Sequence, residues 1–524
     1  MALAIPSMRV LLRILLGWSI LAAVVAKHVE VEEDKAGLTG GHKDFYSGES
    51  IAIRQEDGSA DDEEGGDVAP EDPVEDPEDP EEPEEEEDVI PTNPPPSQDP
   101  WYEPPEGWED EAPGKILKTR PEGVPVCLIK YCADTYQYMY RTSDTHGNAS
   151  WTVATMFLPE GIQAGCDTDP DGCSQGVVAY TIPYDSASSD AVPSYLVQFG
   201  DPYGEMSDMM KRGWFVLVPD YEGPTAAFCD GPQSAYGTLD SVRGAIEIGH
   251  EFGLRTDTAK WAIWGYSGGA FASGFAAEMA EEYAPELDFA GALIGGPSPN
   301  LTTACINMNG EETAGLVISG LIGITAQWPE QRRFLIDHMH KEGPYNASGF
   351  MMARYFPAVY VLYGYANHNV YDYFINGEED VLSPTILDLF DTQGQMGVHG
   401  IPNMLTFVYK AGQDEMSPIE ETDAYVKTFC DGGANLLYHR NSIGSHNQEL
   451  WSGRPRALQF LETVLDGADS IEVPETGCMI ANVTVGLPKW SEIEIGTRYN
   501  PKTGEEVDSR GNPRKSGGQA GQGG

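Results

Sequence analysis

Residues 260–270 read Lys260-Trp261-Ala262-Ile263-Trp264-Gly265-Tyr266-Ser267-Gly268-Gly269-Ala270, a Gly-x-Ser-x-Gly pattern directly after a short apolar run. The following residues, 271–280, are mostly small or apolar and predict a helix. A buried strand, a tight turn and a helix in this order are typical of a nucleophile elbow, which lifts a serine above the end of a sheet. The flanking glycines let strand and helix approach closely, and the helix N-terminus favours negative charge beside the serine. We therefore predict that Ser267 is a nucleophile.

Apolar strands alternate with helical stretches on both sides of this turn. Strands are predicted over 176–180, 214–218, 261–264, 289–294, 404–409 and 435–440, after an antiparallel hairpin formed by 138–141 and 151–158. Helices are predicted over 237–252 and 448–465. This alternation predicts an α/β fold with a mostly parallel central sheet covered by helices on both faces. Ligands of such sheets bind beyond the carboxyl ends of the strands, where Ser267 is placed.

The alternation is interrupted between residues 301 and 400. Helices are predicted over 315–324 and 331–340, and residues 349–365 are apolar and rich in Met, Phe and Tyr. A helical block inserted after the nucleophile strand is where a cap or lid would lie, and its side chains could cover an acyl chain. The alternative is that these are ordinary core helices of an insertion.

Composition divides the chain into six parts. We predict a signal peptide (1–26), an acidic, Pro-rich disordered segment (27–112), a first core part (113–300), a helical cap (301–400), a second core part (401–485) and a polar, Gly-rich disordered tail (486–524). The signal rests on Arg9 and Arg13, an apolar run and small residues before a cleavage site after Ala26. An uncleaved anchor is the alternative, but the apolar run is too short to span a bilayer comfortably. We expect a secreted, extracellular protein.

The chain is strongly acidic. Its formal net charge is −53 and its pI is about 4.3, which argues against nucleic acid as a partner. Much of this charge lies in 27–112, where self-repulsion and scarce apolar residues leave too little to offset the entropy of folding. That segment could be a pro-segment, a wall-binding arm, a solubilising brush or a plain solvated spacer.

The eight cysteines suit an oxidising compartment. They lie at positions 127, 132, 166, 173, 229, 305, 430 and 478, and their spacing does not resemble a zinc site. We expect a local Cys166–Cys173 disulfide and a Cys430–Cys478 disulfide. Glycosylation motifs at Asn148, Asn300, Asn346 and Asn482 are compatible with a secreted glycoprotein.

A serine nucleophile needs a base, and the base needs a carboxylate that holds its tautomer. Asp414 and His446 each follow a predicted strand, in the order Ser, Asp, His that α/β-hydrolases use. Several other residues could fill these roles. His439 lies within a strand, His338 and His340 lie in the predicted cap, Glu415 is one position away from the loop pattern, and Asp423 falls in a helix.

An oxyanion hole needs two donors. One is predicted to be the amide of Gly268, directly after the nucleophile. The other should come from the loop after the strand that begins at residue 176, namely residues 182–186, but the sequence alone does not select a residue there.

These motifs together resemble the fungal secretory lipase family. The matching stretches are Tyr140-Arg141-Thr142-Ser143-Asp144, Val153-Ala154-Thr155, Tyr184-Asp185-Ser186, Val218-Pro219-Asp220-Tyr221-Glu222-Gly223-Pro224, Thr238-Leu239-Asp240-Ser241-Val242-Arg243, Gly265-Tyr266-Ser267-Gly268-Gly269-Ala270, Gly412-Gln413-Asp414-Glu415-Met416-Ser417-Pro418, Cys430-Asp431-Gly432-Gly433-Ala434-Asn435 and His446. They span roughly residues 115 to 480. The acidic segment, the Gly-rich tail and the Cys166/Cys173 insertion depart from the family pattern and bear on regulation and location.

The resemblance implies an α/β-hydrolase fold with a helical cap, the catalytic residues Ser267, Asp414 and His446, and an oxyanion hole formed by Asp185 and Gly268. It implies a carboxylic-ester hydrolase, foremost a triacylglycerol lipase that works through an acyl-serine. An esterase for small acylated metabolites is the alternative, and an inactive hydrolase-like binding protein is less favoured. We expect a lipid or small acyl-ester substrate, transient contact with a lipid–water interface, no cofactor or metal, and no obligate protein partner.

Overall fold

The computed structural model describes residues 93–121, 124–125, 127–160, 176–488 and two short strands, 498–499 and 506–507. The predicted signal peptide, most of the acidic segment (27–92) and the Cys166–Cys173 disulfide lie outside the described residues. No helix among the described residues is long and apolar enough to cross a membrane.

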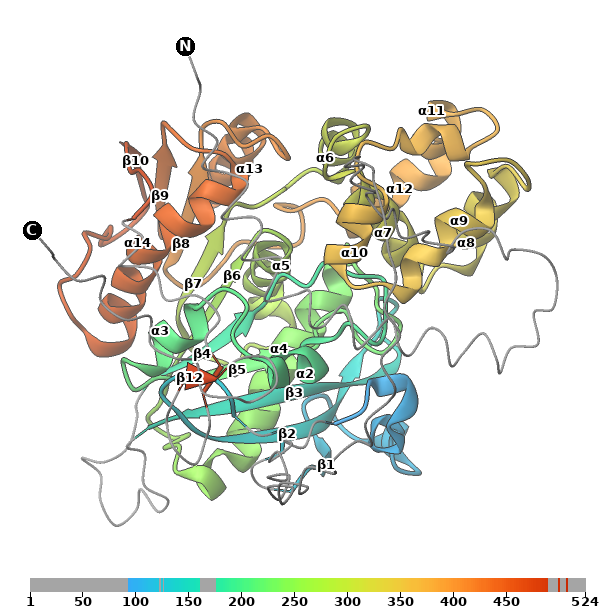
Figure 1. Ribbon diagram of the computed structural model, residues 1–524. Coiled ribbons are helices and arrows are strands. Elements are labelled where there is room, and N and C mark those ends of the chain that lie inside the picture. The colour runs from blue at the N-terminus through green and yellow to red at the C-terminus, as the bar shows by residue number, and fades with distance from the viewer. Residues whose placement is uncertain are drawn as a thin grey trace, which may run out of the picture. The chain divides into compact units, whose positions relative to one another are not determined.

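A ten-stranded mixed sheet forms the core, in the order β1-β2-β3-β5-β4-β6-β7-β8-β9-β10 (Figure 1). Its strands are β1 Ile116–Thr119, β2 Cys132–Ser143, β3 Ala149–Pro159, β4 Gly176–Thr181, β5 Phe215–Pro219, β6 Lys260–Tyr266, β7 Phe289–Gly295, β8 Thr406–Ala411, β9 Leu436–Asn441 and β10 Cys478–Val483. Antiparallel pairing joins β1, β2, β3 and β5, and all pairs from β5 to β10 are parallel. The predicted hairpin and the mostly parallel sheet are therefore confirmed.

Helices cover both faces of the sheet because both faces of the central strands are apolar. On β4, Val178 and Tyr180 pack with α3 (Glu205–Met210) and α14 (His446–Asp466). On the other face, Val177 and Ala179 pack with α4 (Gly231–Ile248) and α5 (Gly268–Tyr283). Farther along that face, α13 (Ile419–Asp431) packs with α5 against β8 and β9.

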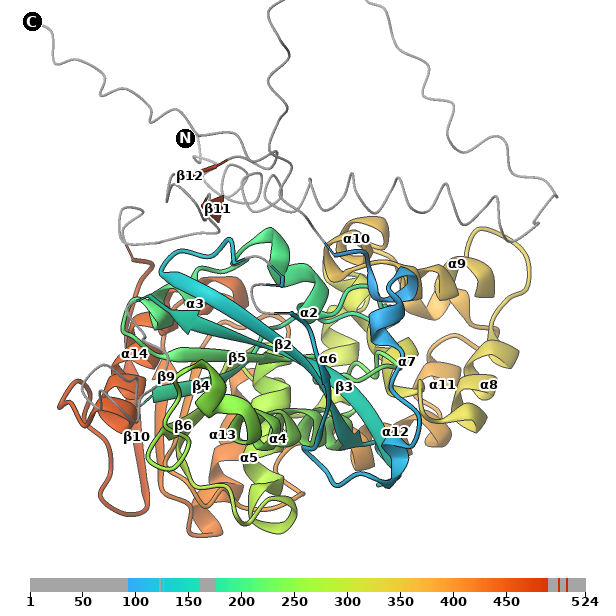
Figure 2. The ribbon, with the colours of Figure 1, turned by 90° about the horizontal axis from the view of Figure 1, so that it is seen from below.

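A block of helices occupies the chain between β7 and β8 and forms one group in both views (Figures 1 and 2). Its α-helices are α6 Leu301–Met308, α7 Ala314–Ile324, α8 Pro329–His338, α9 Ala347–Met351, α10 Ala358–Gly364, α11 Glu378–Val381 and α12 Pro384–Gln393. The 3₁₀ helices η7 (Met352–Tyr355) and η8 (Val370–Tyr373) lie among them. The block has its own apolar core, to which the completely buried α7 contributes most of its side chains.

The end of the predicted disordered segment is folded, so the boundary at residue 112 is wrong. Residues 93–111 contain three 3₁₀ helices, η1 Pro96–Gln98, η2 Pro100–Tyr102 and η3 Trp108–Asp110. Tyr102 packs against Met139 and Val153, and its hydroxyl lies 2.8 Å from Ser194 Oγ. High acid and proline content predicted disorder, but the aromatic side chains of this stretch bury enough apolar surface to order it.

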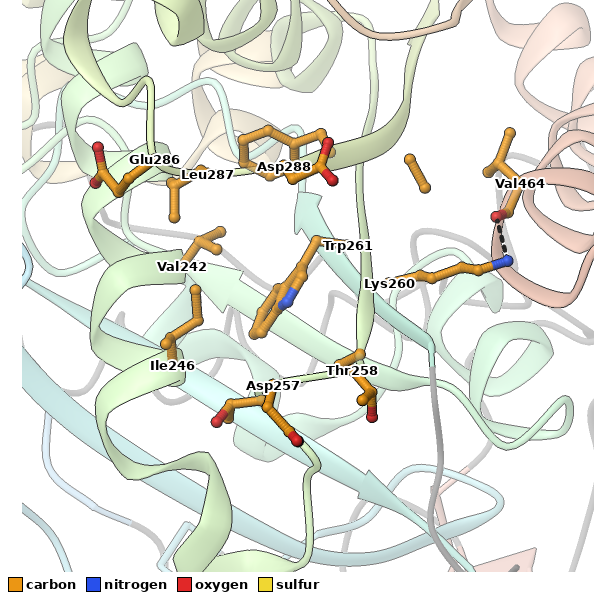
Figure 3. Close-up of a pocket in the computed structure, with 14 residues that line it drawn as sticks. Val242, Ile246, Asp257, Thr258, Lys260, Trp261, Glu286, Leu287, Asp288 and Val464 are labelled. Carbon is orange, nitrogen blue, oxygen red and sulfur yellow. Dashed lines mark hydrogen bonds between the residues drawn. The ribbon is translucent and has the colours of Figure 1, made fainter. Parts of the chain in front are cut away.

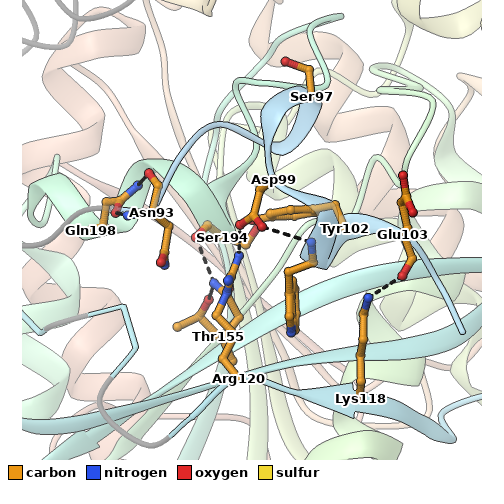
Figure 4. Close-up of polar contacts among 12 residues, drawn as sticks. Asn93, Ser97, Asp99, Tyr102, Glu103, Lys118, Arg120, Thr155, Ser194 and Gln198 are labelled. Carbon is orange, nitrogen blue, oxygen red and sulfur yellow. Dashed lines mark hydrogen bonds and ion pairs between the residues drawn. The ribbon is translucent and has the colours of Figure 1, made fainter.

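Polar contacts also fasten residues 93–111 to the chain that follows β4 (Figure 4). Asn93 N donates to Gln198 Oε1 (2.7 Å), and Ser97 Oγ donates to Asp190 Oδ2 (2.7 Å). The Arg120 guanidinium forms an ion pair with Asp99 and lies 4.2 Å from the centre of the Trp101 ring. Of these partners, Asp190 precedes α2 (Pro193–Leu196) and Gln198 lies in η5 (Val197–Phe199).

The C-terminal tail also departs from prediction at one place. Strand β11 (Arg498–Tyr499) pairs antiparallel with β12 (Glu506–Val507), although the composition predicted no regular structure there (Figure 2). Strand pairing uses backbone groups that every residue except proline possesses, so a polar sequence does not prevent it.

Two disulfides are present among the described residues. Cys430–Cys478 joins the end of α13 to β10, as predicted, and Cys127–Cys132 closes a short loop before β2. Cys229 and Cys305 are free thiols.

Candidate active site

Ser267 lies in the turn between β6 and α5 with φ 56° and ψ −121°, a backbone conformation that is rare outside glycine. A Cβ atom on Gly265 would lie 2.1 Å from the carbonyl oxygen of Gly269, and one on Gly269 would lie 1.9 Å from that of Thr181. Ser267 N donates to the Gly295 carbonyl (2.9 Å). The two glycines are therefore required by the close approach of the two elements, as the sequence predicted.

His446 is the first residue of α14, where the sequence predicted the end of a loop. Ser445 forms a capping box at this helix end, which starts the helix two residues earlier than expected. His446 Nε2 lies 2.8 Å from Ser267 Oγ. The Tyr266 hydroxyl donates to the His446 carbonyl (2.6 Å), and the Glu415 carboxylate accepts from the His446 amide (2.9 Å). Both contacts fix the backbone that carries the imidazole.

Asp414 lies in the loop after β8 and completes a hydrogen-bonded chain to Ser267. Its Oδ2 lies 2.7 Å from His446 Nδ1 and accepts from Lys410 Nζ at 2.8 Å. Its Oδ1 accepts from the amides of Met416 and Ser417 (3.0 Å each). Burial acts to raise the pKa of Asp414, but the contacts with His446 and Lys410 outweigh it and hold that pKa well below its ordinary value. Asp414 is therefore held as an anion in contact with the His446 imidazole.

Asp185 lies beside Gly268, in the loop after β4. It has φ 45°, and a Cβ atom on Gly268 would lie 1.8 Å from Asp185 Oδ1. This oxygen is buried and has no hydrogen-bond partner. Burial raises the pKa of Asp185 to about 6, although His446 acts in the opposite direction. The structure thus brings Asp185 and Gly268 together at the N-terminus of α5.

Neighbouring elements hold this loop on two sides. The Tyr221 hydroxyl donates to the Ile182 carbonyl (2.8 Å). Ser186 Oγ donates to the Phe356 carbonyl (3.0 Å), which follows η7 in the helical block. The position of Asp185 therefore depends on both the sheet and the helical block.

The rival candidates lie elsewhere. His439 packs on Phe407 from within β9, and burial lowers its pKa to about 4. His338 contacts the Phe334 carbonyl within α8, and the amide of His340 bonds to the Tyr373 carbonyl. Asp423 forms an ion pair with Arg440. Glu415, as described above, contacts the backbone of His446 rather than its imidazole.

A separate pocket of about 530 Å³ lies at the end of the sheet opposite to Ser267, near the amino ends of β6 and β7 (Figure 3). Trp261 forms its wall, and Lys260, Asp257 and Asp288 lie around it (Figure 3). Its lining includes none of the residues that surround Ser267. Within the described residues, no group of three or more His, Cys, Asp or Glu side chains could hold a metal ion.

Sequence reasoning did not select Lys410 or Tyr266 as site residues. Tyr266 is part of the Gly-x-Ser-x-Gly motif, so its position directly before Ser267 could have indicated that it lies at the site. Lys410 lies inside an otherwise apolar strand, and a lysine in such a run must have a partner if it is buried.

The family model for secretory lipases matches residues 197–472. A trichothecene C-3 esterase of Fusarium sporotrichioides is 39% identical over 402 residues, covering 74% of this chain and 88% of that protein. The chain belongs to the secretory lipase family.

Two further proteins are similar to this chain, one in sequence and one in fold. Lipase A of Arthroderma benhamiae is 32% identical over 76% of this chain and 85% of its own length. The crystal structure of Candida antarctica lipase A superimposes with a TM-score of 0.64 at 24% identity, covering 76% of this chain and 91% of that one. The protein is accordingly a serine ester hydrolase with an α/β-hydrolase fold, as predicted from the sequence.

Proposed function

We propose that this protein cleaves carboxylic esters by transient acylation of Ser267, with His446 as general base and acid and Asp414 as the orienting anion. The observation that carries this proposal is the continuous chain of contacts, 2.7 Å from Asp414 Oδ2 to His446 Nδ1 and 2.8 Å from His446 Nε2 to Ser267 Oγ. Ser267 Oγ attacks the carbonyl carbon and gives its proton to His446 Nε2. The imidazolium then protonates the leaving alcohol, and a water molecule repeats the sequence to release the acid.

The negative charge of the tetrahedral intermediate needs donors at a fixed position. We assign this role to the backbone amides of Gly268, the first residue of α5, and of Asp185, whose side chain lies beside Gly268. The protonated carboxyl of Asp185 would add a third donor at acidic pH, in keeping with its raised pKa of about 6.

For the substrate we propose a water-insoluble acylglycerol, with the helical block (301–400) as a cap that meets the lipid. Tyr355 and Tyr363 of this block expose 44% and 58% of their surface. Large exposed apolar side chains suit contact with a lipid phase. A secretory family suits an extracellular location, where such lipids are met.

A second candidate is an esterase for small acylated metabolites. Two relatives favour it, the Fusarium trichothecene C-3 esterase (39% identical) and a probable trichothecene esterase of Stachybotrys chartarum (34% identical). Tributyrin as an emulsion and p-nitrophenyl acetate in solution separate the candidates. A sharp rise in rate when the emulsion forms supports the lipase, and indifference to the interface supports the metabolite esterase.

The nucleophile is tested by labelling with a fluorophosphonate and mapping of the adduct by mass spectrometry. The adduct is expected on Ser267 and absent in Ser267→Ala, which should also lose turnover. A labelled Ser267→Ala protein with normal turnover would contradict the proposal.

The cap is tested with Tyr363→Ser, which should slow emulsion hydrolysis and spare p-nitrophenyl acetate. Ile480→Ser, which changes an equally exposed apolar residue on β10, is its matched control.

A further inference from the structure

Lys410 is a buried cation at the proposed site. It lies on β8, with a side chain that is 0% exposed. Its Nζ donates to Asp414 Oδ2 (2.8 Å) and to the Pro297 carbonyl (2.7 Å). An ammonium group is removed from water only at a high cost in free energy, so its burial calls for a partner of opposite charge. Asp414 is that partner.

Lys410 and His446 share one oxygen of Asp414. Both Lys410 Nζ and His446 Nδ1 contact Oδ2, whereas Oδ1 accepts from two backbone amides. The carboxylate that orients the imidazole is therefore already neutralised by a cation on the same oxygen. Burial lowers the pKa of Lys410, and the Asp414 carboxylate opposes that shift.

Other charged and titratable groups around this pair come from four parts of the fold. Glu415 contacts the His446 amide from the loop after β8, and Asp185 faces His446 from the loop after β4. Glu449 on α14 forms an ion pair with Arg456 of the same helix. The Tyr266 hydroxyl, at the end of β6, donates to the His446 carbonyl. Among these groups, Lys410 is the cation that shares Oδ2 with the imidazole.

We propose that Lys410 is a positioning residue for the Asp414–His446 pair, and that its charge extends the activity of the site toward acidic pH. This inference rests on the function proposed above. A cation within a few ångströms opposes the gain of a second positive charge at the site, because like charges raise each other's energy when they are buried. Pro297 holds the ammonium group in place, and the contact of that group with Oδ2 restrains rotation of the carboxylate.

The test is Lys410→Met in the full chain, which removes the charge and keeps the length of the side chain. The rate of fluorophosphonate labelling and kcat/KM for p-nitrophenyl acetate are measured from pH 3.5 to 9. The acid limb of both profiles should move toward higher pH by about one unit, with a plateau lowered about 10-fold or less. Lys260→Met, which removes one positive charge at the amino end of β6, at the end of the sheet opposite to Ser267, should leave the profiles unchanged.

Coincident acid limbs in the wild type, Lys410→Met and Lys260→Met would overturn the proposal, even with a lowered plateau. Lys410→Gln replaces Lys410→Met if the latter does not fold. Failure of both neutral variants to fold, while Lys410→Arg folds, would also overturn it in favour of a purely structural role. A wild-type protein that is neither labelled nor active would instead refute the proposed function, so the two failures are distinguishable.

Discussion

Single atoms at the site have little freedom to move. Ser267 has a positive φ, Asp414 uses both carboxylate oxygens, and His446 is held through its backbone as well as its ring. Pre-organisation of this kind reduces the reorganisation needed when charge develops in the transition state. At the residue scale, therefore, small substitutions should change rates far more than stability.

Asp414→Asn should lower kcat by about 10⁴-fold, because an amide in place of the carboxylate favours the wrong tautomer of His446. Steady-state kinetics on p-nitrophenyl acetate measure the change. Asp423→Asn is the control, since Asp423 pairs with Arg440 outside the site and should keep normal turnover. Near-normal turnover of folded Asp414→Asn would remove Asp414 from the mechanism.

Gly268→Ala should lower kcat by about 10²-fold or more, a loss comparable to that of one oxyanion donor. The added methyl group would lie 1.8 Å from Asp185 Oδ1, so Asp185 must move and its amide with it. Gly364→Ala adds the same group in open space on α10 and should be harmless. Equal rates in the two variants would show that Asp185 does not contribute to the reaction.

At the scale of elements, residues 93–111 pack on the chain that follows Asp185. They contact Asp190, Ser194 and Gln198, all within fourteen residues of Asp185 in sequence. Ser194 also donates to the buried Asp220 carboxylate, from its amide at 2.7 Å and its hydroxyl at 2.5 Å. This segment is therefore a part of the folded domain that supports the loop after β4.

Tyr102→Ala should reduce the free energy of unfolding by about 3 kcal/mol, because it empties a buried aromatic position. Tyr102→Phe, which removes only the contact with Ser194, should cost about 1 kcal/mol. Urea denaturation followed by fluorescence measures both changes. If Tyr102→Ala is as stable as the wild type, residues 93–111 do not support the domain.

At the scale of the whole molecule, several buried carboxyl groups have raised pKa values and make stability depend on pH. Burial raises the pKa of Glu205, Asp220 and Glu278 to about 7 and that of Asp230 to about 6. At these four carboxyls, the folded protein therefore binds more protons than the unfolded chain between pH 4 and 7. Stability falls with rising pH wherever the folded state binds more protons, so the stabilisation present at acidic pH is lost as pH rises through these raised values.

The melting temperature should accordingly be higher at pH 5 than at pH 8, as followed by circular dichroism. Glu205→Gln should reduce this difference, because a carboxyl that is 1% exposed and has one oxygen without a partner no longer titrates. Glu247→Gln, on the exposed surface of α4, should leave the difference unchanged. A melting temperature that rises from pH 5 to pH 8 would contradict this assignment of protons.

Local sequence determined the fold class and the candidate residues. Hydrophobic periodicity and glycine placement act within a few neighbouring residues, so the strands, the turn at Ser267 and the loop holding Asp414 could be read directly. His446, predicted to lie in a loop, instead begins α14. Only the tertiary structure decided which histidine meets the serine 179 positions away, that Glu415 contacts a backbone amide, and that Lys410 shares an oxygen of Asp414. It also decided that residues 93–111 fold, because their aromatic side chains find partners on strands far along the chain. Such contacts depend on how distant segments are brought together in space, which no short stretch of sequence specifies.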